Sequence, residues 1–551
     1  MRYAIWGSKH RARRLAICLD DEVSFFIDSN PLSRGWIGEK PIYHPDDIHN
    51  WDDLFVYVPK NFYEEIVPVL IGKGLAEGSD FAPYPLGLAI GIDFQKVLKH
   101  LEQSKQEFQQ YHAPCENMTF FFSVMLTQCH PYMAFVAKMI AQKLPIGIVS
   151  RNYCCTADAL WEEYQSSMAF FGMKPMMDSN LVILNGQISA EEAKSIVDDP
   201  ILSNAMLHHR LFTGRKAASD LSKDASVCMI FAMKKYAEMF VKYIRPAMVV
   251  LHGSSDSFHK VFAHICGSHG IPVWFTHEGV IPGTFVIEPK GEMGHSLPAM
   301  YPDRFSSLPV ADAEVAHTQK VWDYLYESKL NRKVQPPNDC LEYIHTRIQK
   351  DRPTIFFAGQ NDIGSHMVPY TEITQKYHSP IFRSSLEAAI YLAEICEKNG
   401  WNFIYKPHPD YVKPEQVEQL PKNTIFIAKG DINTLIDVAD VTVTILSTTN
   451  YNALIRHKPV VMLGYNQTKG KGCTYEAFEK DKIEGAIKAA LENGFTQAQQ
   501  DEFLLHMAQC LKYYLYDDLQ ERPIRYGRPV PKSMDEFYEL ERLLKGAVGK
   551  E

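Results

Sequence analysis

The sequence has no apolar run long enough to cross a membrane. Its longest such run, residues 118–126, falls well short of the roughly 18 residues that a spanning helix needs. The apolar part of the first residues, Leu15–Leu19, is also far too short for the core of a signal peptide. We therefore expect a cytoplasmic protein whose membrane association, if it has any, is peripheral and at the inner face of the cytoplasmic membrane.

Positive charge is scarce as well. The 57 lysine and arginine residues are outnumbered by 66 aspartate and glutamate residues, which gives a formal net charge of −9. Proteins that bind nucleic acid normally carry a basic surface, so we expect no nucleic-acid partner. The 11 cysteines show no paired metal-ligand spacing, and histidines such as His208 and His209 show no zincin or deaminase spacing. We therefore predict no metal site and no cofactor.

What the sequence does have is the composition of a globular protein with several domains. Hydrophobic residues make up 46% of the chain and aromatic residues 12%. At roughly 100–200 residues per domain, a chain of 551 residues forms about three domains. We place them at residues 1–100, 101–338 and 339–551.

Residues 1–100 show the pattern of a small Rossmann-like domain. The segment Phe26-Ile27-Asp28-Ser29-Asn30-Pro31 resembles one that recurs in the Rossmann-like domain at the front of bacterial sugar acyltransferases. The turn Gly7-Ser8-Lys9-His10 lacks the further glycines that let backbone approach a pyrophosphate. This favours a structural or docking role over cofactor binding. Strands are expected at Tyr3–Gly7, Val23–Ile27 and Leu54–Val58, and a helix at Tyr63–Gly74.

Short apolar strands alternate with helical patterns through the rest of the chain, as is typical of parallel sheets buried on both faces. In 101–338 the strands are expected at Thr119–Leu126, Pro145–Ser150, Leu181–Asn185, Met248–His252 and Pro272–Thr276. In 339–551 they are expected at Thr354–Gly359, Asn402–Tyr405, Thr424–Ala428, Val441–Leu446 and Pro459–Leu463. We predict an α/β fold in which these two Rossmann-like domains face a cleft, a preferred place for ligands.

The most informative segment is Lys406-Pro407-His408-Pro409, which follows a predicted strand. Proline disfavours the α region for the residue before it, so Lys406 and His408 should stay extended where the strand leaves the sheet. Ligands of open α/β sheets bind beyond the carboxyl ends of the strands, where a fixed lysine and histidine suit a phosphate. The alternative is a surface proline loop.

Three hydroxyl residues, Ser447, Thr448 and Thr449, follow another strand of the same domain and open a helix. A helix N-terminus attracts phosphate, although a simple N-cap explains the same residues. We expect the two strands to be neighbours, so that these hydroxyls share one rim of the sheet with Lys406 and His408. Each signal then supports the other.

Further polar residues belong to the same domain. Gln360 and Asp362 follow its first strand and would face the same cleft. Lys469 and Lys471 alternate with glycines in a basic segment. This segment either closes on a charged donor or is a solvated turn.

The domain at 101–338 contributes a carboxylate, Glu278, within the long irregular segment 277–296. A long irregular segment with polar groups is uncommon in a compact domain unless it forms a functional site. A carboxylate there would serve as nucleophile or base in sugar transfer. Local capping or a local salt bridge is the alternative for Glu278.

Taken together, residues 245–480 resemble the bacterial capsule polysaccharide synthase family, which includes the β-Kdo glycosyltransferases. The segments that carry the resemblance are, in order, His277-Glu278-Gly279, Pro289-Lys290-Gly291, Gln360, Ser379-Pro380, Lys406-Pro407-His408-Pro409, Ser447-Thr448, Ala453-Leu454, Lys458-Pro459-Val460 and Gly472-Cys473-Thr474.

The resemblance implies a GT-B architecture, with the nucleotide sugar held mainly by the C-terminal half and the acceptor mainly by the N-terminal half. Lys406, His408, Ser447 and Thr448 would hold the nucleotide phosphate, and Glu278 would take part in catalysis. The expected catalytic residues are thus Glu278, Lys406 and His408.

His277, Gly279, Thr449 and Asn452 complete the expected substrate-binding set, together with Gln360, Asp362, Lys469 and Lys471. Asn452 stands where family members often have an acid, and the segment after Gly279 lacks an arginine that is common in the Kdo enzymes. Transfer of another sugar is therefore compatible with the resemblance.

We predict a glycosyltransferase that moves Kdo or a related sugar from a CMP-linked donor to a capsule or other surface-polysaccharide acceptor. Its partners would be the nucleotide sugar, a glycan or glycolipid acceptor, and other polysaccharide-assembly proteins. The alternatives are a transferase of glycerol phosphate from a CDP-linked donor, and a non-catalytic module that binds polysaccharide or scaffolds assembly. The donor, the acceptor, the linkage, the stereochemistry and the oligomeric state stay open.

A basic stretch near the end contains Arg522, Arg525, Arg528 and Lys532. We interpret it as a solvated tail, with contact to anionic lipid as the alternative.

Overall fold

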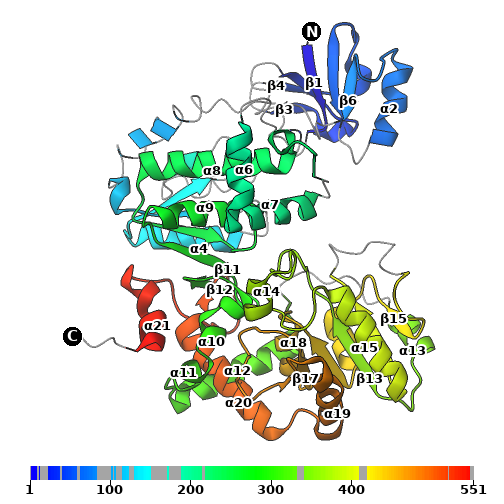
Figure 1. Ribbon diagram of the computed structural model, residues 1–551, viewed down its shortest axis with the longest axis vertical. Helices are drawn as coiled ribbons and strands as arrows, with labels where there is room; N and C mark the ends of the chain where they lie inside the picture. Colours follow the sequence, from blue (N-terminus) through cyan, green and yellow to red (C-terminus); the bar gives the residue numbers. More distant parts are fainter. Residues whose placement is uncertain are drawn as a thin grey trace. The chain divides into compact units, whose positions relative to one another are not determined.

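The structure is a computed structural model in which the chain forms three β-sheets with helices packed against them (Figure 1). This confirms the predicted α/β class with several Rossmann-like sheets. The residues that it describes are 2–8, 12, 23–37, 40–58, 63–83, 98, 101–102, 105–106, 109, 114–122, 130–150, 170–172, 188–213, 217–331, 340–408, 418–518 and 520–546.

The first sheet has the strand order β3-β4-β2-β1-β5-β6 and is parallel except between β3 and β4. Asp28 follows β2, and its carboxylate accepts the backbone N–H groups of Ser8 at 3.1 Å and of Asn30 at 3.0 Å. It thereby fixes the turns after β1 and β2. The elements are β1 (Arg2–Trp6), β2 (Val23–Ile27), β3 (Gly35–Ile37), β4 (Lys40–Tyr43), β5 (Leu54–Val58), α2 (Tyr63–Gly72) and β6 (Phe81–Pro83).

The second sheet has the order β19-β12-β11-β10-β7-β8-β9, and β12 runs antiparallel to both β11 and β19. The strand expected at 272–276 extends to Glu278, and the one expected at 181–185 lies outside the described residues. The elements are β7 (Thr119–Phe122), α4 (His130–Ala141), β8 (Ile146–Ser150), β9 (Phe170–Gly172), α6 (Ala190–Asp198), α7 (Pro200–Thr213), α8 (Ala225–Ile244), β10 (Met248–His252), α9 (Ser257–Ser268), β11 (Val273–Glu278), β12 (Thr284–Glu288) and β19 (Tyr516–Asp517).

The third sheet is parallel throughout, with the order β15-β14-β13-β16-β17-β18. Every strand expected in this part of the chain is present. The elements are α13 (Leu341–Arg347), β13 (Thr354–Ala358), α14 (Glu372–Tyr377), α15 (Ser385–Asn399), β14 (Asn402–Lys406), β15 (Thr424–Phe426), α17 (Ile432–Val438), β16 (Val441–Thr444), α18 (Thr449–Ile455), β17 (Val460–Met462), β18 (Tyr475–Glu476) and α19 (Ile483–Asn493).

The remaining helices are α10 (Leu297–Met300), α11 (Pro302–Ser306), α12 (Asp312–Ser328), α20 (Gln497–Gln509), the π-helical turn η11 (Cys510–Tyr514) and α21 (Asp535–Lys545).

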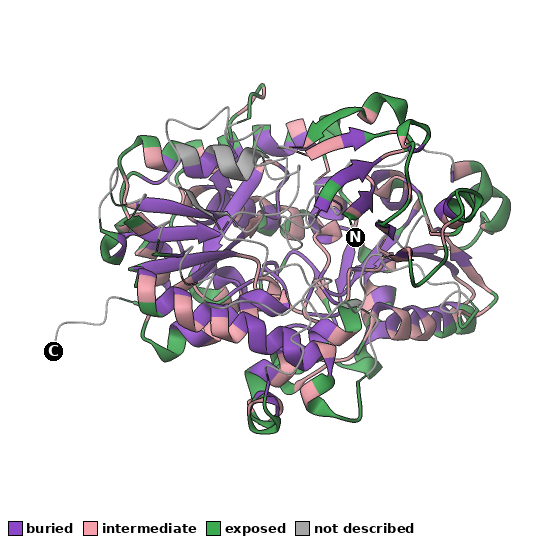
Figure 2. Cartoon of the chain, turned by 90° about the horizontal axis from the view of Figure 1, so that it is seen from above, coloured by how far each residue is buried: buried purple, intermediate pink, exposed green. Residues whose placement is uncertain are grey.

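The central strand β13 shows why the strands of the third sheet are apolar at nearly every position in the sequence. All of its residues are buried, as the purple strands of Figure 2 illustrate. Ile355 and Phe357 pack into one core with α15 and α19, whereas Phe356 and Ala358 pack into another with α17, α18 and α20. Because successive side chains of a strand point to opposite faces, a strand covered on both faces must be apolar at every position.

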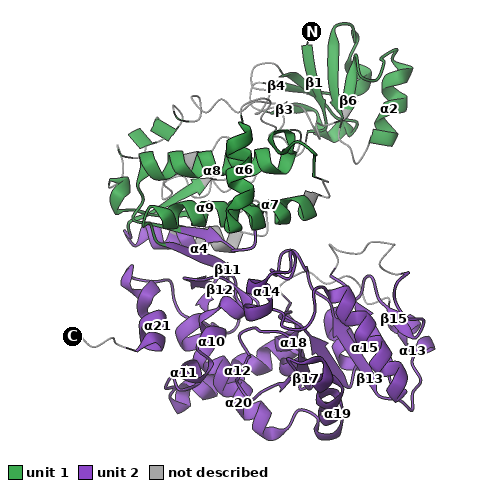
Figure 3. Cartoon of the chain, viewed as in Figure 1, with its two compact units in different colours: residues 1–130, 145–249, 257–272 green, residues 131–144, 250–256, 273–551 purple. Residues whose placement is uncertain are grey.

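By its contacts the chain divides into two compact units (Figure 3). One comprises residues 1–130, 145–249 and 257–272, and the other comprises residues 131–144, 250–256 and 273–551. The second unit contains the whole third sheet, together with β11, β12, β19 and the loop after β10. The predicted domain boundaries and the predicted cleft stay predictions.

Candidate functional site

Lys406 is the last residue of β14 and is buried. Its carbonyl oxygen accepts a hydrogen bond of 2.9 Å from the N–H of Gly359, which follows β13. A Cβ atom on Gly359 would lie 3.1 Å from the ring of Tyr405 and 3.2 Å from the carbonyl oxygen of Lys406, so glycine suits this close approach. His408 is half-buried. Lys406 and His408 therefore stand at the carboxyl edge of the third sheet, and their binding role stays a prediction.

Gln360 joins the loops after β13 and β16. Its Oε1 accepts the backbone N–H of Leu446 at 2.8 Å, and its Nε2 donates to the hydroxyl of Ser365 at 3.1 Å. The side chain is buried, and both the oxygen and the nitrogen of its amide group form hydrogen bonds within the protein. The geometry gives Gln360 a positioning role, and the predicted contact with substrate stays a prediction.

Asp362, in the loop after β13, forms hydrogen bonds to Ser385, the first residue of α15. Its carboxylate accepts the backbone N–H of Ser385 at 2.9 Å and the Ser385 hydroxyl at 2.5 Å. Burial nevertheless raises the pKa of Asp362 to about 6, because removing a carboxylate from water disfavours its charged form.

This raised pKa predicts a pH-dependent stability. An aspartate in the unfolded chain loses its proton near pH 3.9, whereas folded Asp362 keeps it to about pH 6. At Asp362 the folded state therefore binds more protons in this window, and the contribution of Asp362 to stability falls as the pH rises from about 4 to 6. We expect Asp362→Asn to remove up to about 2–3 kcal/mol of that fall.

Urea unfolding of the wild type and of Asp362→Asn between pH 4 and 7 measures the effect of Asp362 on stability. The difference between the two proteins cancels the titration of the other carboxyl groups. Parallel stability curves for the wild type and Asp362→Asn would contradict the prediction.

Helix α18 begins at the three hydroxyl residues after β16, where Ser447 and Thr449 bond to each other. The Oγ of Ser447 lies 2.9 Å from Oγ1 of Thr449 and accepts the Thr449 N–H at 3.3 Å, while the Thr448 carbonyl accepts from Tyr451. Further along the helix, the Asn452 side chain donates to that of Asn331. The helix start is thus built as predicted, and the ligand contacts of these residues stay predictions.

The expectation that β14 and β16 are neighbours is wrong. Strand β13 lies between them and pairs with both. Neighbouring strands are about 4.8 Å apart, so the two loops are separated by about twice that distance. The loop after β13, which carries Gln360, fills the gap and bonds to the loop after β16.

Lys471 was expected in a segment that either closes on a charged donor or is a solvated turn. The solvated turn is wrong for Lys471, and its contact with a donor stays a prediction. Its side chain is buried, and its Nζ donates to the carbonyl oxygens of Pro298 at 3.2 Å and Pro302 at 2.7 Å. Burial lowers the pKa of Lys471 to about 8. The Nζ of Lys469 lies 4.1 Å from the ring centre of Tyr465. Lys471 therefore serves the packing of α10 and α11.

The motif His277-Glu278-Gly279 ends β11. The N–H of Gly279 donates to the carbonyl of Thr284 at 2.7 Å, closing the turn into β12. A Cβ atom on Gly279 would lie 2.0 Å from the Thr284 hydroxyl and 2.9 Å from Leu515. This position admits only glycine for packing reasons, whereas Glu278 is half-buried at the strand end. The predicted roles of the motif in binding and catalysis stay predictions.

Sequence reasoning missed a cluster of a serine and three histidine side chains. The Oγ of Ser254, in the loop after β10, lies 3.0 Å from Nε2 of His366. The His366 ring stacks on that of His378, with ring centres 5.0 Å apart, and His295 lies edge-on to His378 at 4.7 Å. Burial, with Lys290 nearby, lowers the pKa of His295 to about 4, so its ring is neutral at pH 7.

The cluster connects the loops of two sheets. Ser254 belongs to the second sheet's loops, while His366 and His378 come from loops of the third. Isolated histidines give no periodic signal, and only the irregular segment 277–296, which contains His295, pointed to this region. The loops after β10, β12 and β13 therefore form one neighbourhood.

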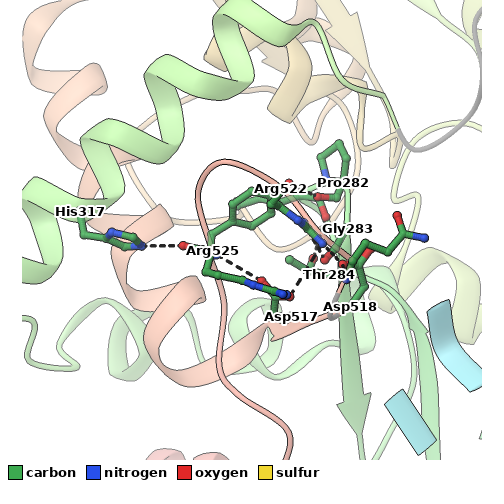
Figure 4. A network of polar contacts seen from close by, with 11 residues as sticks. Pro282, Gly283, Thr284, His317, Asp517, Asp518, Arg522 and Arg525 are labelled. Atoms are coloured by element: carbon green, nitrogen blue, oxygen red, sulfur yellow. Dashed lines mark hydrogen bonds and ion pairs between the residues drawn. The ribbon is translucent and has the colours of Figure 1, made fainter. Parts of the chain in front are cut away.

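The basic residues near the C-terminus form a latch rather than a solvated tail (Figure 4). Arg522 pairs with Asp518 and donates to the carbonyl of Gly283 at 3.2 Å, and Arg525 pairs with Asp517 at 2.9 Å. The Tyr526 hydroxyl donates to Pro282 at 2.8 Å. The expectation of a solvated tail is wrong for Arg522, whose buried side chain contacts Asp518 and Gly283, whereas Arg525 is paired but exposed.

Within the described ranges, we find no helix that combines the length and the apolar character needed to cross a membrane. The same ranges contain no group of three histidine, cysteine, aspartate or glutamate side chains placed to hold a metal ion.

Residues 374–513 match the model of a family described as capsule polysaccharide biosynthesis protein. The matched region includes the loops after β14, β16 and β17. The predicted resemblance to capsule polysaccharide synthases is therefore confirmed for this part of the chain. No curated protein sequence matches the chain.

Several solved structures are similar at low sequence identity. The KpsC β-Kdo 2,7 transferase of Thermosulfurimonas dismutans is 18% identical, with 49% of this chain and 88% of that chain covered and a TM-score of 0.30. The KpsC β-Kdo 2,4 transferase of that organism is 14% identical, with 54% and 87% covered and a TM-score of 0.35. A putative UDP-N-acetylglucosamine 2-epimerase from Listeria monocytogenes is 11% identical, with 78% and 95% covered and a TM-score of 0.28. The activities of these proteins differ, so the similarities select none for this chain.

Proposed function

We propose that this protein is a glycosyltransferase of capsule polysaccharide biosynthesis, which moves a sugar from a nucleotide-linked donor to a surface-polysaccharide acceptor. One observation carries the proposal. Lys406, His408 and the hydroxyl residues 447–449 all lie at the carboxyl edge of one parallel sheet, within the region that matches the capsule biosynthesis family. Parallel α/β sheets bind their ligands at this edge.

The chemistry of these groups suits the departure of a nucleotide. The ammonium group of Lys406 and the imidazole of His408 would neutralise the phosphate of the leaving group. Stabilisation of charge that develops in the transition state is usually the largest catalytic contribution, so these two residues are assigned most of the rate enhancement. Glu278 would act at the sugar carbon as nucleophile or base.

For the donor we propose Kdo or a related sugar linked to CMP. The support is the resemblance of the motifs at Glu278 and Lys406 to those of the β-Kdo glycosyltransferases. The proposed acceptor is a glycan or glycolipid, reached at the inner face of the cytoplasmic membrane with other polysaccharide-assembly proteins. We propose that the reaction needs no metal or other cofactor.

A thermal-shift panel of CMP-, CDP-, UDP- and GDP-linked compounds tests the donor. A ligand that binds only the native state stabilises it by about 2.7 kcal/mol at a concentration of 100 Kd. We expect the CMP-linked compounds to raise the Tm most. Selective stabilisation by CDP-glycerol would instead indicate a glycerol phosphate transferase, and no stabilisation by any nucleotide would indicate a non-catalytic module.

A further inference from the structure

Both ring nitrogens of His277 face oxygen atoms. The Nδ1 atom lies 2.8 Å from the carbonyl oxygen of Glu278, and the Nε2 atom lies 3.4 Å from Oε1 of Glu288. A carbonyl oxygen can only accept a hydrogen bond, so Nδ1 carries a proton. Whether Nε2 also carries one depends on the charge of Glu288.

Glu288 ends β12 and has no exposed surface. Its Oε2 accepts the backbone N–H of Leu297 at 2.6 Å, and its Oε1 accepts the hydroxyl of Tyr514. Two donors from separate segments therefore converge on this carboxylate. Burial raises the pKa of Glu288, and hydrogen bonds of this kind oppose that shift because they favour the ionised form of a buried acid.

A second carboxylate adds to the negative charge around His277. The Glu292 carboxylate accepts the N–H of Ser254 at 3.0 Å, and its Oε1 lies where a Cβ atom on Gly253 would be 2.9 Å away. Burial by itself lowers the pKa of His277, but the charges of Glu292 and Glu288 outweigh burial and raise this pKa above its usual value.

The alternative is a neutral pair in which Glu288 carries the proton and Nε2 of His277 is bare. In that arrangement Leu297 and Tyr514 would donate to an uncharged acid, and the charge of Glu292 would not be offset at His277. In the ionic pair, Leu297 and Tyr514 donate to a charged carboxylate, and Glu292 adds its negative charge near the His277 cation.

We propose that Glu288 is a positioning residue that keeps the imidazole of His277 doubly protonated and fixed in orientation. The end of β11 then presents a permanent positive charge beside Glu278. The His277 side chain is 12% exposed while Glu288 is 0% exposed, so only the cation of the pair reaches the surface. Its part in catalysis rests on the proposed function, where this charge would attract an anionic group of the nucleotide sugar.

This assignment also changes the role of His277. With a proton on each nitrogen the ring has no free lone pair, so it cannot act as a base near neutral pH. A base or nucleophile at this strand end is then Glu278.

Histidine NMR on the full chain tests the proposal without any donor. The protein is labelled with ¹³C at histidine Cε1, and the His277 signal is identified by its loss in His277→Gln. We expect the wild-type signal to stay at the protonated position through pH 7. In Glu288→Gln we expect the titration midpoint to fall by at least one pH unit, a tenfold loss of proton affinity.

Tyr514→Phe is the matched control, because it removes a neighbouring donor but keeps the Glu288 carboxylate. Leu297 still donates to the carboxylate in this variant, so its His277 midpoint should fall by less than that of Glu288→Gln. If Glu288→Gln does not fold, Glu288→Asp keeps the charge at a greater distance and should lower the midpoint by a smaller amount. A wild-type midpoint at or below pH 7, or no change in the glutamate variants, overturns the proposal.

The pH profile of turnover separates this proposal from the proposed function. The Glu288→Gln enzyme should lose turnover as the pH rises from 6 to 8, while the wild type should not lose it in this range. If no nucleotide sugar is turned over but the NMR midpoints behave as expected, the proposed function fails and the assignment of Glu288 stands. A Glu288→Gln pH profile identical to that of the wild type overturns its catalytic part.

Discussion

Replacement of Arg522 by methionine is expected to lower the free energy of unfolding by about 3–5 kcal/mol. The Arg522 side chain is 7% exposed, pairs with Asp518 and donates to the carbonyl of Gly283 (Figure 4). Methionine keeps much of the volume but leaves the Asp518 carboxylate, whose side chain is 6% exposed, without its cation. An uncompensated buried charge is among the largest single destabilising changes in a protein. Urea unfolding followed by circular dichroism measures the loss.

Arg525 provides a matched control in the same latch. It pairs with Asp517 at 2.9 Å, but its side chain is 56% exposed. Arg522, 3.8 Å from Asp517, and the N–H of Tyr526 still face the buried Asp517 carboxylate when Arg525 is lost. Because exposed ion pairs contribute only about 0–1 kcal/mol, Arg525→Met should cost much less than Arg522→Met. Equal losses for the two variants would show that burial of Arg522 does not determine the stability of the latch.

The strands of the third sheet could be predicted because burial on both faces leaves a local signal. Residues 354–358 and 402–405 are continuously apolar or nearly so, and proline or glycine follows closely after each strand. The same local chemistry placed Lys406 at a strand end. Such signals need no knowledge of which segments meet in space.

The order of the strands could not be predicted in this way. The sequences of β14 and β16 do not indicate that β13 pairs with both of them. The hydrophobic pattern of a central strand is the same whichever strand lies beside it. The bond from Gln360 to Leu446 depends on that order. The loop contacts of the site therefore became visible only in three dimensions.

Charge was misread where it is buried. Lys471 lies between two glycines, a pattern typical of an exposed turn, yet carbonyl oxygens more than 160 residues away in the chain surround its ammonium group. Arg522 likewise finds Gly283 across the chain. A single sequence gives no signal for partners this distant, so lysine and arginine are read as exposed by default.

Loss of the Lys406 side chain is expected to have the largest effect on activity. With the donor identified by the nucleotide panel, the turnover number of Lys406→Ala should fall by about 10²–10³-fold, the effect of removing one group that stabilises transition-state charge. Lys406 stands at the carboxyl edge of the third sheet, and no other residue of the strand carries a cation. A coupled assay of nucleotide release under saturating donor measures the change.

Two comparisons make the Lys406 result decisive. Lys398, on α15, is 69% exposed and pairs with Glu484 at the surface, so Lys398→Ala should keep the wild-type turnover number. The Tm of Lys406→Ala should stay close enough to that of the wild type for the protein to be fully folded under assay conditions. A folded Lys406→Ala enzyme with a wild-type turnover number would remove Lys406 from the reaction. The leaving phosphate would then have to be stabilised by His408 and by the loop after β16, where Ser447 and Thr449 already bond to each other.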